Sequence, residues 1–199
     1  MRARAFHHFV RDERAASTVE FVAIMPFFVL IAFFILEISV ATFRIATAEK
    51  AVQLAARMAA VSDPAATGVP TINARAGSGV YGDQCNTGAC STAWSPKTCT
   101  GTGCTAAAFD PIWNRMQNIF NVPKANVTIT YSDAGLGFAG GPTIPSVTVT
   151  VSGVPYDTIF TAILQNFFTT TGAGASPFVN LPPMSVTMTA EDLTTAGAS

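Results

Sequence analysis

The sequence predicts an α+β fold, in which a long N-terminal helix (a transmembrane span plus an amphipathic extension) is followed by a small domain of antiparallel sheet and two helices. Three observations predict this class. An uncharged apolar run occupies residues 21–36, an Ala-rich segment without Gly or Pro follows at 47–61, and two later segments alternate Val or Ile with Thr. Only 12% of the residues are charged, which is about half the share of a typical soluble domain. A membrane-anchored chain is therefore favoured.

The apolar run is long enough to cross a membrane. As a helix, residues 21–36 rise by about 24 Å, and continuation through residue 43 extends the rise to roughly 34 Å. A hydrocarbon core is about 30 Å thick, so we expect one crossing at about residues 21–43. The tail before it is basic, with four arginines against two acidic residues: Arg2, Arg4, Arg11 and Arg14 against Asp12 and Glu13. The positive-inside rule then keeps residues 1–15 in the cytoplasm and exports the rest.

A single carboxylate, Glu20, stands at the entrance to the apolar run. Desolvation of an ionised carboxylate near hydrocarbon costs several kcal/mol unless a cation meets it. A cut between Ala15 and Ala16 would supply that cation, because the new α-amino group would lie one helical turn from Glu20. We therefore expect a processing site at Ala15 and Ala16, after a short basic leader.

The stretch Ala16-Ser-Thr-Val-Glu20-Phe21, preceded by Ala15, resembles the processing site of type IV prepilins. There a basic leader is removed before a residue that lies four positions ahead of a Glu and a long apolar helix. In detail the stretch is similar to TadE-like proteins, the small pseudopilin-like proteins of tight-adherence (Flp-type) pilus assembly. The family usually has Gly before the cut, where this chain has Ala15. Weaker similarities to the family lie at residues 137–142 and 188–193.

The resemblance implies a non-enzymatic pseudopilin-like protein that takes part in the assembly or initiation of tight-adherence pili. It implies a single-pass protein of the bacterial inner membrane, with a cytoplasmic N-terminus and a periplasmic C-terminal domain. The implied partners are a prepilin peptidase, other pilin-like subunits, pilus platform proteins and the lipid bilayer. Glu20 and Phe21 would pack against other subunits. Pro26, which removes one helical hydrogen bond, would let the helix adjust as it packs.

Two other interpretations of the N-terminal segment stay open. Ser39-Val-Ala41 offers small residues at the spacing that signal peptidase uses, so the segment could be a cleaved secretory signal. Against this, the apolar run exceeds the usual signal core of about 7 to 15 residues. The segment could also be an unprocessed single-span anchor. The exported domain would then bind a surface ligand or adhesion target, through exposed loops that carry Tyr81, Trp94 and Phe138.

Residues 47–61 are predicted to extend the helix as an amphipathic segment. Its polar side chains gather on one side, and small apolar side chains gather on the other: Glu49, Lys50, Gln53 and Arg57 against Val52, Ala55, Ala56 and Ala59. We call the second group the alanine ladder. Small side chains allow another element to approach closely, and we expect the ladder to pack on the chain's own globular part or on neighbouring subunits. One helix over residues 16–61 follows from this pattern.

Residues 62–108 are typical of a loop region, because they are crowded with Gly, Ser, Thr, Ala and Pro. Four cysteines lie within it, in two pairs with four residues between the members of each: Cys85 and Cys90, then Cys99 and Cys104. Disulfides are the first interpretation in an exported segment. Three pairings are possible, and the pattern does not choose among them. No metal site is expected, because structural zinc pairs usually have two residues between the cysteines and no His lies nearby.

Residues 109–199 are predicted to form the α+β domain. We expect a helix from Asp110, its cap, to about Phe120, and a second helix at about 157–168. Residues 126–131 and 146–152 alternate in the strand period, and a last strand is expected near 184–190. Two helices against a three-stranded antiparallel sheet would form the core, and the Thr residues of the strands would face water.

The residue inventory argues against two function classes. An enzyme needs an activated nucleophile, a metal or a carboxylate pair, yet the only histidines, His7 and His8, lie in the N-terminal tail. We therefore expect no catalytic residues and no cofactor. From Ser62 onward the chain has four basic residues against seven acidic ones. This net negative charge disfavours a nucleic-acid partner, because it repels phosphate.

Overall fold

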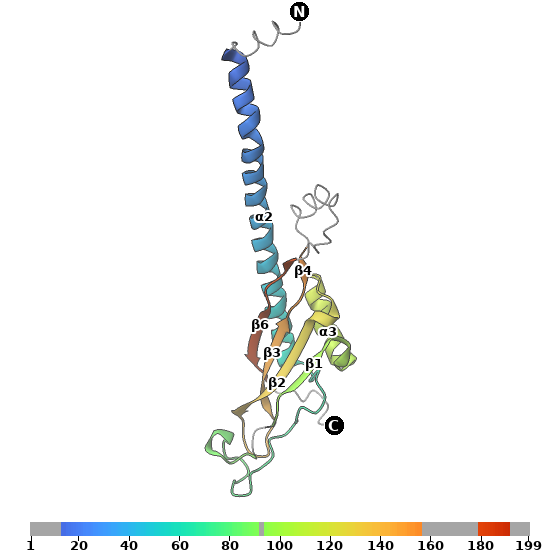
Figure 1. Cartoon of the computed structure of the whole chain (residues 1–199). Coiled ribbons are helices and arrows are strands. Elements are labelled where there is room, and N and C mark those ends of the chain that lie inside the picture. Colours follow the sequence, from blue (N-terminus) through green and yellow to red (C-terminus); the bar gives the residue numbers. More distant parts are fainter. Residues whose placement is uncertain (1–12, 92–93, 157–178, 192–199) are drawn as a thin grey trace, which may run out of the picture. The chain divides into compact units, whose positions relative to one another are not determined.

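The computed structural model describes residues 13–91, 94–156 and 179–191. It shows a mixed α+β protein that begins with one long helix, α2, from Glu13 to Val61 (Figure 1). The described residues fall into two compact units. The first contains α2 as far as Phe43, and the second contains residues 44–156 together with 179–191. A second helix, α3, spans Ala106–Gln117 in the second unit.

The part of α2 in the first unit is apolar and mostly exposed over residues 18–43. It is the one helix of the described residues that is long and apolar enough to cross a membrane, with a mean hydropathy of 2.7 in its apolar stretch. The helix continues through Pro26 without a break. Two of its hydroxyl side chains bond back to the helix, since Ser39 donates to the carbonyl of Ile35 and Thr42 lies 2.9 Å from that of Ile38. These two hydroxyls are thus satisfied without water.

The second unit contains a four-stranded antiparallel sheet in the order β1-β2-β3-β6. Two short strands, β4 and β5, pair separately. Short 3₁₀ turns η1, η2 and η3 occupy Cys85–Thr87, Gly101–Gly103 and Lys124–Asn126. The strands are Lys97–Thr100 (β1), Val127–Leu136 (β2), Ile144–Val151 (β3), Pro155–Tyr156 (β4), Val179–Asn180 (β5) and Met184–Thr189 (β6).

The two faces of the sheet differ because side chains alternate along each strand. One face is buried and apolar: Val127, Ile129, Tyr131, Val147, Val149 and Val151. The opposite face carries exposed threonines whose hydroxyls pair across neighbouring strands. Thr148 lies 2.8 Å from Thr187 on β6, and two further pairs join β1 to β2: Thr98 with Thr130 at 3.0 Å, and Thr100 with Thr128 at 2.9 Å. Placement of these threonines on the outer face agrees with the alternation in the sequence.

The alanine ladder packs within the chain's own domain. Val52, Ala55, Ala56 and Ala59 are completely buried, whereas the polar side of the helix is exposed. Two hydrogen bonds fix the end of α2 beside the sheet. The amide of Glu191, just beyond β6, donates to the carbonyl of Ala60 at 3.0 Å, and the amide of Ala65 donates to the Tyr131 hydroxyl at 3.1 Å. The ladder was expected to pack on the chain's own globular part or on neighbouring subunits, and the structure shows the first of these.

Three details of the expected fold need correction. The sheet has a fourth strand, β1, inside the segment that was expected to be loop. Helix α3 begins at Ala106, and its cap residue is Thr105, whose carbonyl accepts from the amide of Phe109 at 2.9 Å. Asp110 therefore caps nothing and instead forms an ion pair with Lys124 at 2.7 Å. Ile112 and Met116 in α3 are buried, but Ile119, which follows the helix, is 42% exposed. The helix expected at 157–168 lies outside the described residues.

Tyr131 leads to a prediction about alkaline pH. Its ring is fully buried, and burial raises the pKa of its hydroxyl, while the hydrogen bond from Ala65 partly offsets this rise. Because the folded-state pKa exceeds the unfolded value, the stability from this group is complete below about pH 10. It is lost as the pH rises through the folded-state pKa. We expect the free energy of unfolding of the full chain to fall above about pH 10, as measured by urea titration at a series of pH values.

The variant Tyr131→Phe separates this effect from other alkaline titrations. It should flatten the alkaline fall, and it should lower stability at neutral pH by about 1–3 kcal/mol because the buried Ala65 amide loses its acceptor. The matched control is Tyr81→Phe, because Tyr81 is 72% exposed. An alkaline fall that persists unchanged in Tyr131→Phe would show that another group is responsible.

Candidate functional site

The expected processing and packing residues all lie on the N-terminal part of α2. The helix begins at Glu13, so Ala15 and Ala16 are in its first turn. Glu20 follows Ala16 by four residues, which places it one turn further along the same face. The side chains of Glu20 and Phe21 are exposed, with Phe21 exposed by 64%. A cut after Ala15 would therefore place a new terminus beside an accessible carboxylate.

The apolar surface that follows is large. Big hydrophobic side chains are exposed around the whole circumference of the helix over residues 19–43, among them Ile24, Phe27, Phe28, Ile31, Phe34 and Ile35. Phe27 is 69% exposed and Phe28 68% exposed. A soluble protein rarely exposes a continuous apolar surface of this extent. Lipid, other apolar helices, or both must cover it.

Comparison with protein families finds a match over this helix. Residues 15–57 match the family model of TadE-like proteins. The match starts at the expected processing site, contains the apolar surface and ends within the amphipathic part of α2, before the sheet. The resemblance predicted from Ala16 to Phe21 is thereby confirmed. The comparison with curated proteins gave no match, and the comparison with solved structures gave none.

The TadE-like match links the chain to tight-adherence (Flp-type) pilus systems. TadE-like proteins are components of pilus assembly and are not known as enzymes. Interaction with other pilus components is a property of the matched family, and the one apolar helix of the described residues is consistent with a membrane anchor. Within the described ranges no three His, Cys, Asp or Glu side chains gather as a metal site would require.

The four cysteines lie in the sheet domain, outside the matched residues 15–57. The sulfur atoms of Cys85 and Cys90 lie within bonding distance, with Cα atoms 4.7 Å apart, and Cys99 and Cys104 are paired in the same way with Cα atoms 5.0 Å apart. Of the three possible pairings, the structure therefore shows the one in which each cysteine bonds to the partner five residues away. Cys99 is in β1 and is buried, so its pair joins the edge strand to the segment that leads into α3.

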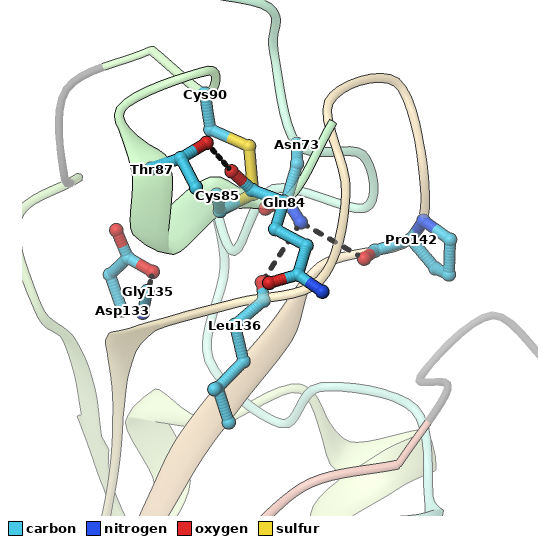
Figure 2. Close-up of a disulfide and its surroundings, with 9 residues drawn as sticks. All are labelled: Asn73, Gln84, Cys85, Thr87, Cys90, Asp133, Gly135, Leu136 and Pro142. Carbon is cyan, nitrogen blue, oxygen red and sulfur yellow. Dashed lines mark hydrogen bonds between the residues drawn. A yellow bond between two sulfur atoms is a disulfide. The ribbon is translucent and has the colours of Figure 1, made fainter. Parts of the chain in front are cut away.

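Asn73 holds the loop of the first cysteine pair against the β2–β3 hairpin. Its side-chain amide donates to the carbonyl of Leu136 at 3.2 Å and to that of Pro142 at 3.1 Å (Figure 2). The amide of Cys85 donates to the carbonyl of Gly137 at 2.9 Å. Gly137 has φ of +95°, and a Cβ there would lie 2.6 Å from the Asn73 amide nitrogen. Only glycine permits this close approach.

The role of Asn73 was not predicted. A lone Asn in a Gly- and Ala-rich loop carries no sequence signal for a contact with a hairpin more than sixty residues later. The glycines of the hairpin were the available clue, because a glycine that must adopt positive φ often marks a close backbone approach.

Proposed function

We propose that this protein is a membrane-anchored pseudopilin-like component of tight-adherence (Flp-type) pilus assembly or initiation. The TadE-like match over residues 15–57 carries the proposal. It coincides with a helix whose apolar surface is exposed and whose first carboxylate, Glu20, lies one turn beyond Ala16. The protein lies in the bacterial inner membrane as a single pass, with residues 1–15 cytoplasmic and the sheet domain periplasmic, as the basic tail supports.

The proposed mechanism begins with cleavage by a prepilin peptidase between Ala15 and Ala16. The freed α-amino group and Glu20 then form an ion pair at the edge of the bilayer. Such a pair lowers the cost of a carboxylate near hydrocarbon, because neither charge remains alone. A pair within one chain only neutralises the carboxylate, whereas a pair with the amine of a neighbouring subunit also ties two subunits together.

The exposed apolar helix then packs laterally on other pilin-like subunits and on pilus platform proteins. In a bilayer such packing depends on van der Waals contact and on hydrogen bonding, since lipid is as apolar as the helices. Phe21 contributes contact area at the start of the span. Pro26 supplies a position that lacks one backbone hydrogen bond, so the helix can adjust there during assembly.

The sheet domain gives each subunit a surface outside the membrane. Because the alanine ladder is buried in that domain, residues 48–60 of α2 belong to its core. In this proposal the two cysteine pairs fasten the loops of the domain in an oxidising compartment.

Mass spectrometry of the mature protein tests the cleavage step. We expect an N-terminus at Ala16 in the detergent-extracted membrane fraction. An intact N-terminal leader in piliated cells would contradict processing and favour the unprocessed anchor. A mature start after Ala41, with the protein in the soluble periplasmic fraction, would instead show a secretory signal.

Substitution of Glu20 tests the pairing step. In Glu20→Gln the side chain keeps its shape but loses its charge, so we expect a strong loss of piliation and of crosslinking between subunits, with membrane insertion intact. The matched control is Glu49→Gln, which changes an exposed carboxylate on the polar side of the same helix. Piliation that is equal in Glu20→Gln and in the control would remove the charge pair from the mechanism.

A further inference from the structure

The two edges of the four-stranded sheet differ in how they are protected. Edge strand β1 has four residues and begins with Lys97 directly after Pro96. Edge strand β6 has six residues, Met184–Thr189, with neither a charged side chain nor a proline among them (Figure 1). Short length, charge and proline are the features that keep sheet edges from pairing with other chains. Strand β6 has none of these protections.

The hydrogen bonds around β6 show which of its backbone groups point away from the sheet. The amide of Ala190 donates to the carbonyl of Pro145 in β3 at 2.8 Å. Alternate residues of an edge strand direct their backbone groups to the same side, so Met188 and Val186 also bond to β3. The residues between them direct their N–H and C=O groups outward: Ser185, Thr187 and Thr189.

These outward backbone groups are open to a partner. Glu191, the next residue in the outward row, donates its amide to the carbonyl of Ala60 at 3.0 Å, so the open row ends there. Among the described residues, none of the three residues before it forms a backbone hydrogen bond on this side, and all three are exposed. The donors and acceptors recur about every 6.8 Å along the strand. Another extended backbone is the partner that matches such a row.

The side chains of β6 indicate the composition of that partner. On one face, two rows of hydroxyl residues cross all four strands in register: Thr98, Thr130, Thr148 and Thr187, then Thr100, Thr128, Thr150 and Ser185. On the opposite face Val186 and Met188 are only half-buried, although the valines opposite them in β3 are completely buried. A fifth strand that alternates hydroxyl and apolar residues would extend the rows and cover the two half-buried side chains.

The direction of β6 argues against a second copy of this chain as the partner. Just before β6, Val179 pairs with Tyr156, whose ring lies 5.1 Å from the guanidinium carbon of Arg44, and just after β6, Glu191 bonds to Ala60. Strand β6 therefore runs in the same direction as this part of α2. Antiparallel pairing of two β6 strands would point the two α2 helices in opposite directions, which two copies anchored in one bilayer cannot adopt. Parallel pairing would place the hydroxyl face of one copy beside the apolar face of the other.

We propose that the outer edge of β6 binds an extended, uncharged segment of another protein, which joins the sheet as a fifth strand. Backbone hydrogen bonds to Ser185, Thr187 and Thr189 hold the segment, and its alternation of hydroxyl and apolar side chains gives specificity. The inference goes beyond the role of the TadE-like helix. Only the exclusion of a second copy rests on the proposed membrane anchor.

A synthetic peptide with the sequence of residues 183–191 is the probe, because β6 is complementary to its own sequence in one antiparallel register. With Thr187 opposite Thr187 of the peptide, Ser185 lies opposite Thr189, and all the outward groups are paired. Glu191, whose amide already bonds to Ala60, then lies opposite Pro183, which has no N–H. A free peptide has no membrane anchor, so the antiparallel direction is open to it.

Amide hydrogen exchange, measured by NMR on the full chain in lipid nanodiscs, locates the added strand. Without peptide, the amides of Thr187 and Thr189 should exchange quickly, whereas those of Val186 and Met188 are protected by β3. Saturating peptide should slow exchange at Thr187 by about tenfold and leave Val186 unchanged. Slow exchange at Thr187 without peptide would show that the edge is already occupied. That result, or an unchanged rate with peptide, would overturn the proposal.

Two methylated peptides test whether the backbone is what binds. Methylation of the peptide nitrogens at Ser185 and Thr187 removes donors that face the edge. Methylation at Val186 and Met188 removes the same number of donors on the far side. Only the first peptide should bind about tenfold more weakly, as measured by fluorescence anisotropy. If both bind as tightly as the unmodified peptide, no strand is added and the proposal is wrong.

A matched pair of variants tests the edge from the protein side. Thr187→Pro removes the central outward donor, whereas Thr187→Val keeps it, and both lose the hydroxyl contact with Thr148 at 2.8 Å. An edge strand tolerates proline where the N–H faces solvent. We expect Thr187→Pro to bind the peptide about tenfold more weakly than Thr187→Val. Equal binding by two folded variants would contradict the proposal, and if Thr187→Pro fails to fold, the methylated peptides decide the question on the natural chain.

Discussion

The variant Phe109→Ala should lower the free energy of unfolding of the sheet domain by about 3–5 kcal/mol. Phe109 lies in the first turn of α3 and is 1% exposed, so it is among the largest fully buried side chains of the described residues. Its removal takes apolar surface out of the core and leaves a cavity that the surrounding strands fill only in part. Urea unfolding of the full chain in nanodiscs, followed by the fluorescence of Trp113 in the same helix, measures the loss.

The control for this experiment is Ile119→Ala, because Ile119 follows α3 directly and is 42% exposed. Loss of this side chain should cost only about 1 kcal/mol, since 42% of its surface already contacts water. The comparison also checks the position of α3. Similar losses in the two variants would mean that α3 does not present Phe109 to the core.

The second large effect is expected from Ala56→Leu in the alanine ladder. Ala56 is 0% exposed, and its short side chain lets α2 lie close to the apolar face of the sheet. A leucine adds three carbon atoms where no space exists, and such overpacking costs about 1–3 kcal/mol or more. It should also push the helix end away from its two hydrogen-bonded contacts, Ala60 with Glu191 and Ala65 with Tyr131. We therefore expect the loss to lie at the upper end of that range.

Gln53→Leu provides the matched control, because it adds the same side chain to the exposed side of the same helix. This change should stay within about 0.5 kcal/mol of the natural chain. Thermal unfolding in nanodiscs compares the two. If Ala56→Leu unfolds at the same temperature as Gln53→Leu, the ladder is not closely packed in solution.

The long helix and two central strands could be predicted because their patterns are local. Residues 47–61 show helical spacing, and β2 and β3 alternate Val or Ile with Thr over many residues. Strand β1 has only four residues, Lys97 to Thr100, and exists because Cys99 lies opposite Ile129 in the sheet. Such a strand is defined by its partner rather than by its own sequence. The start of α3 was missed because Asp110-Pro111 imitates a helix start, whereas the preceding alanines already belong to the helix.

The candidate site residues also differ in whether a local sequence pattern predicts them. Glu20 could be recognised because its distance from Ala16 is a fixed number of residues along one helix. Trp94 and Tyr81 were recognised only as loop side chains that could meet a ligand. Asn73 lies more than sixty residues before the β2–β3 hairpin, and the two converge through the hydrogen bonds from its side-chain amide to Leu136 and Pro142. No periodicity or spacing in the sequence records that convergence.

The contact between Ala60 and Glu191 sets an order of events during synthesis. The ladder of α2 is made early, but the strand that completes the sheet beside β3 is β6, which comes near the end of the described chain. Until Met184 to Glu191 emerge, the hydrophobic interior of the domain has one open side. Loop closure over so long a stretch is slow compared with local helix formation. An incomplete nascent chain thus presents unprotected apolar surface, and it is a natural substrate for chaperones and proteases until its last strand arrives.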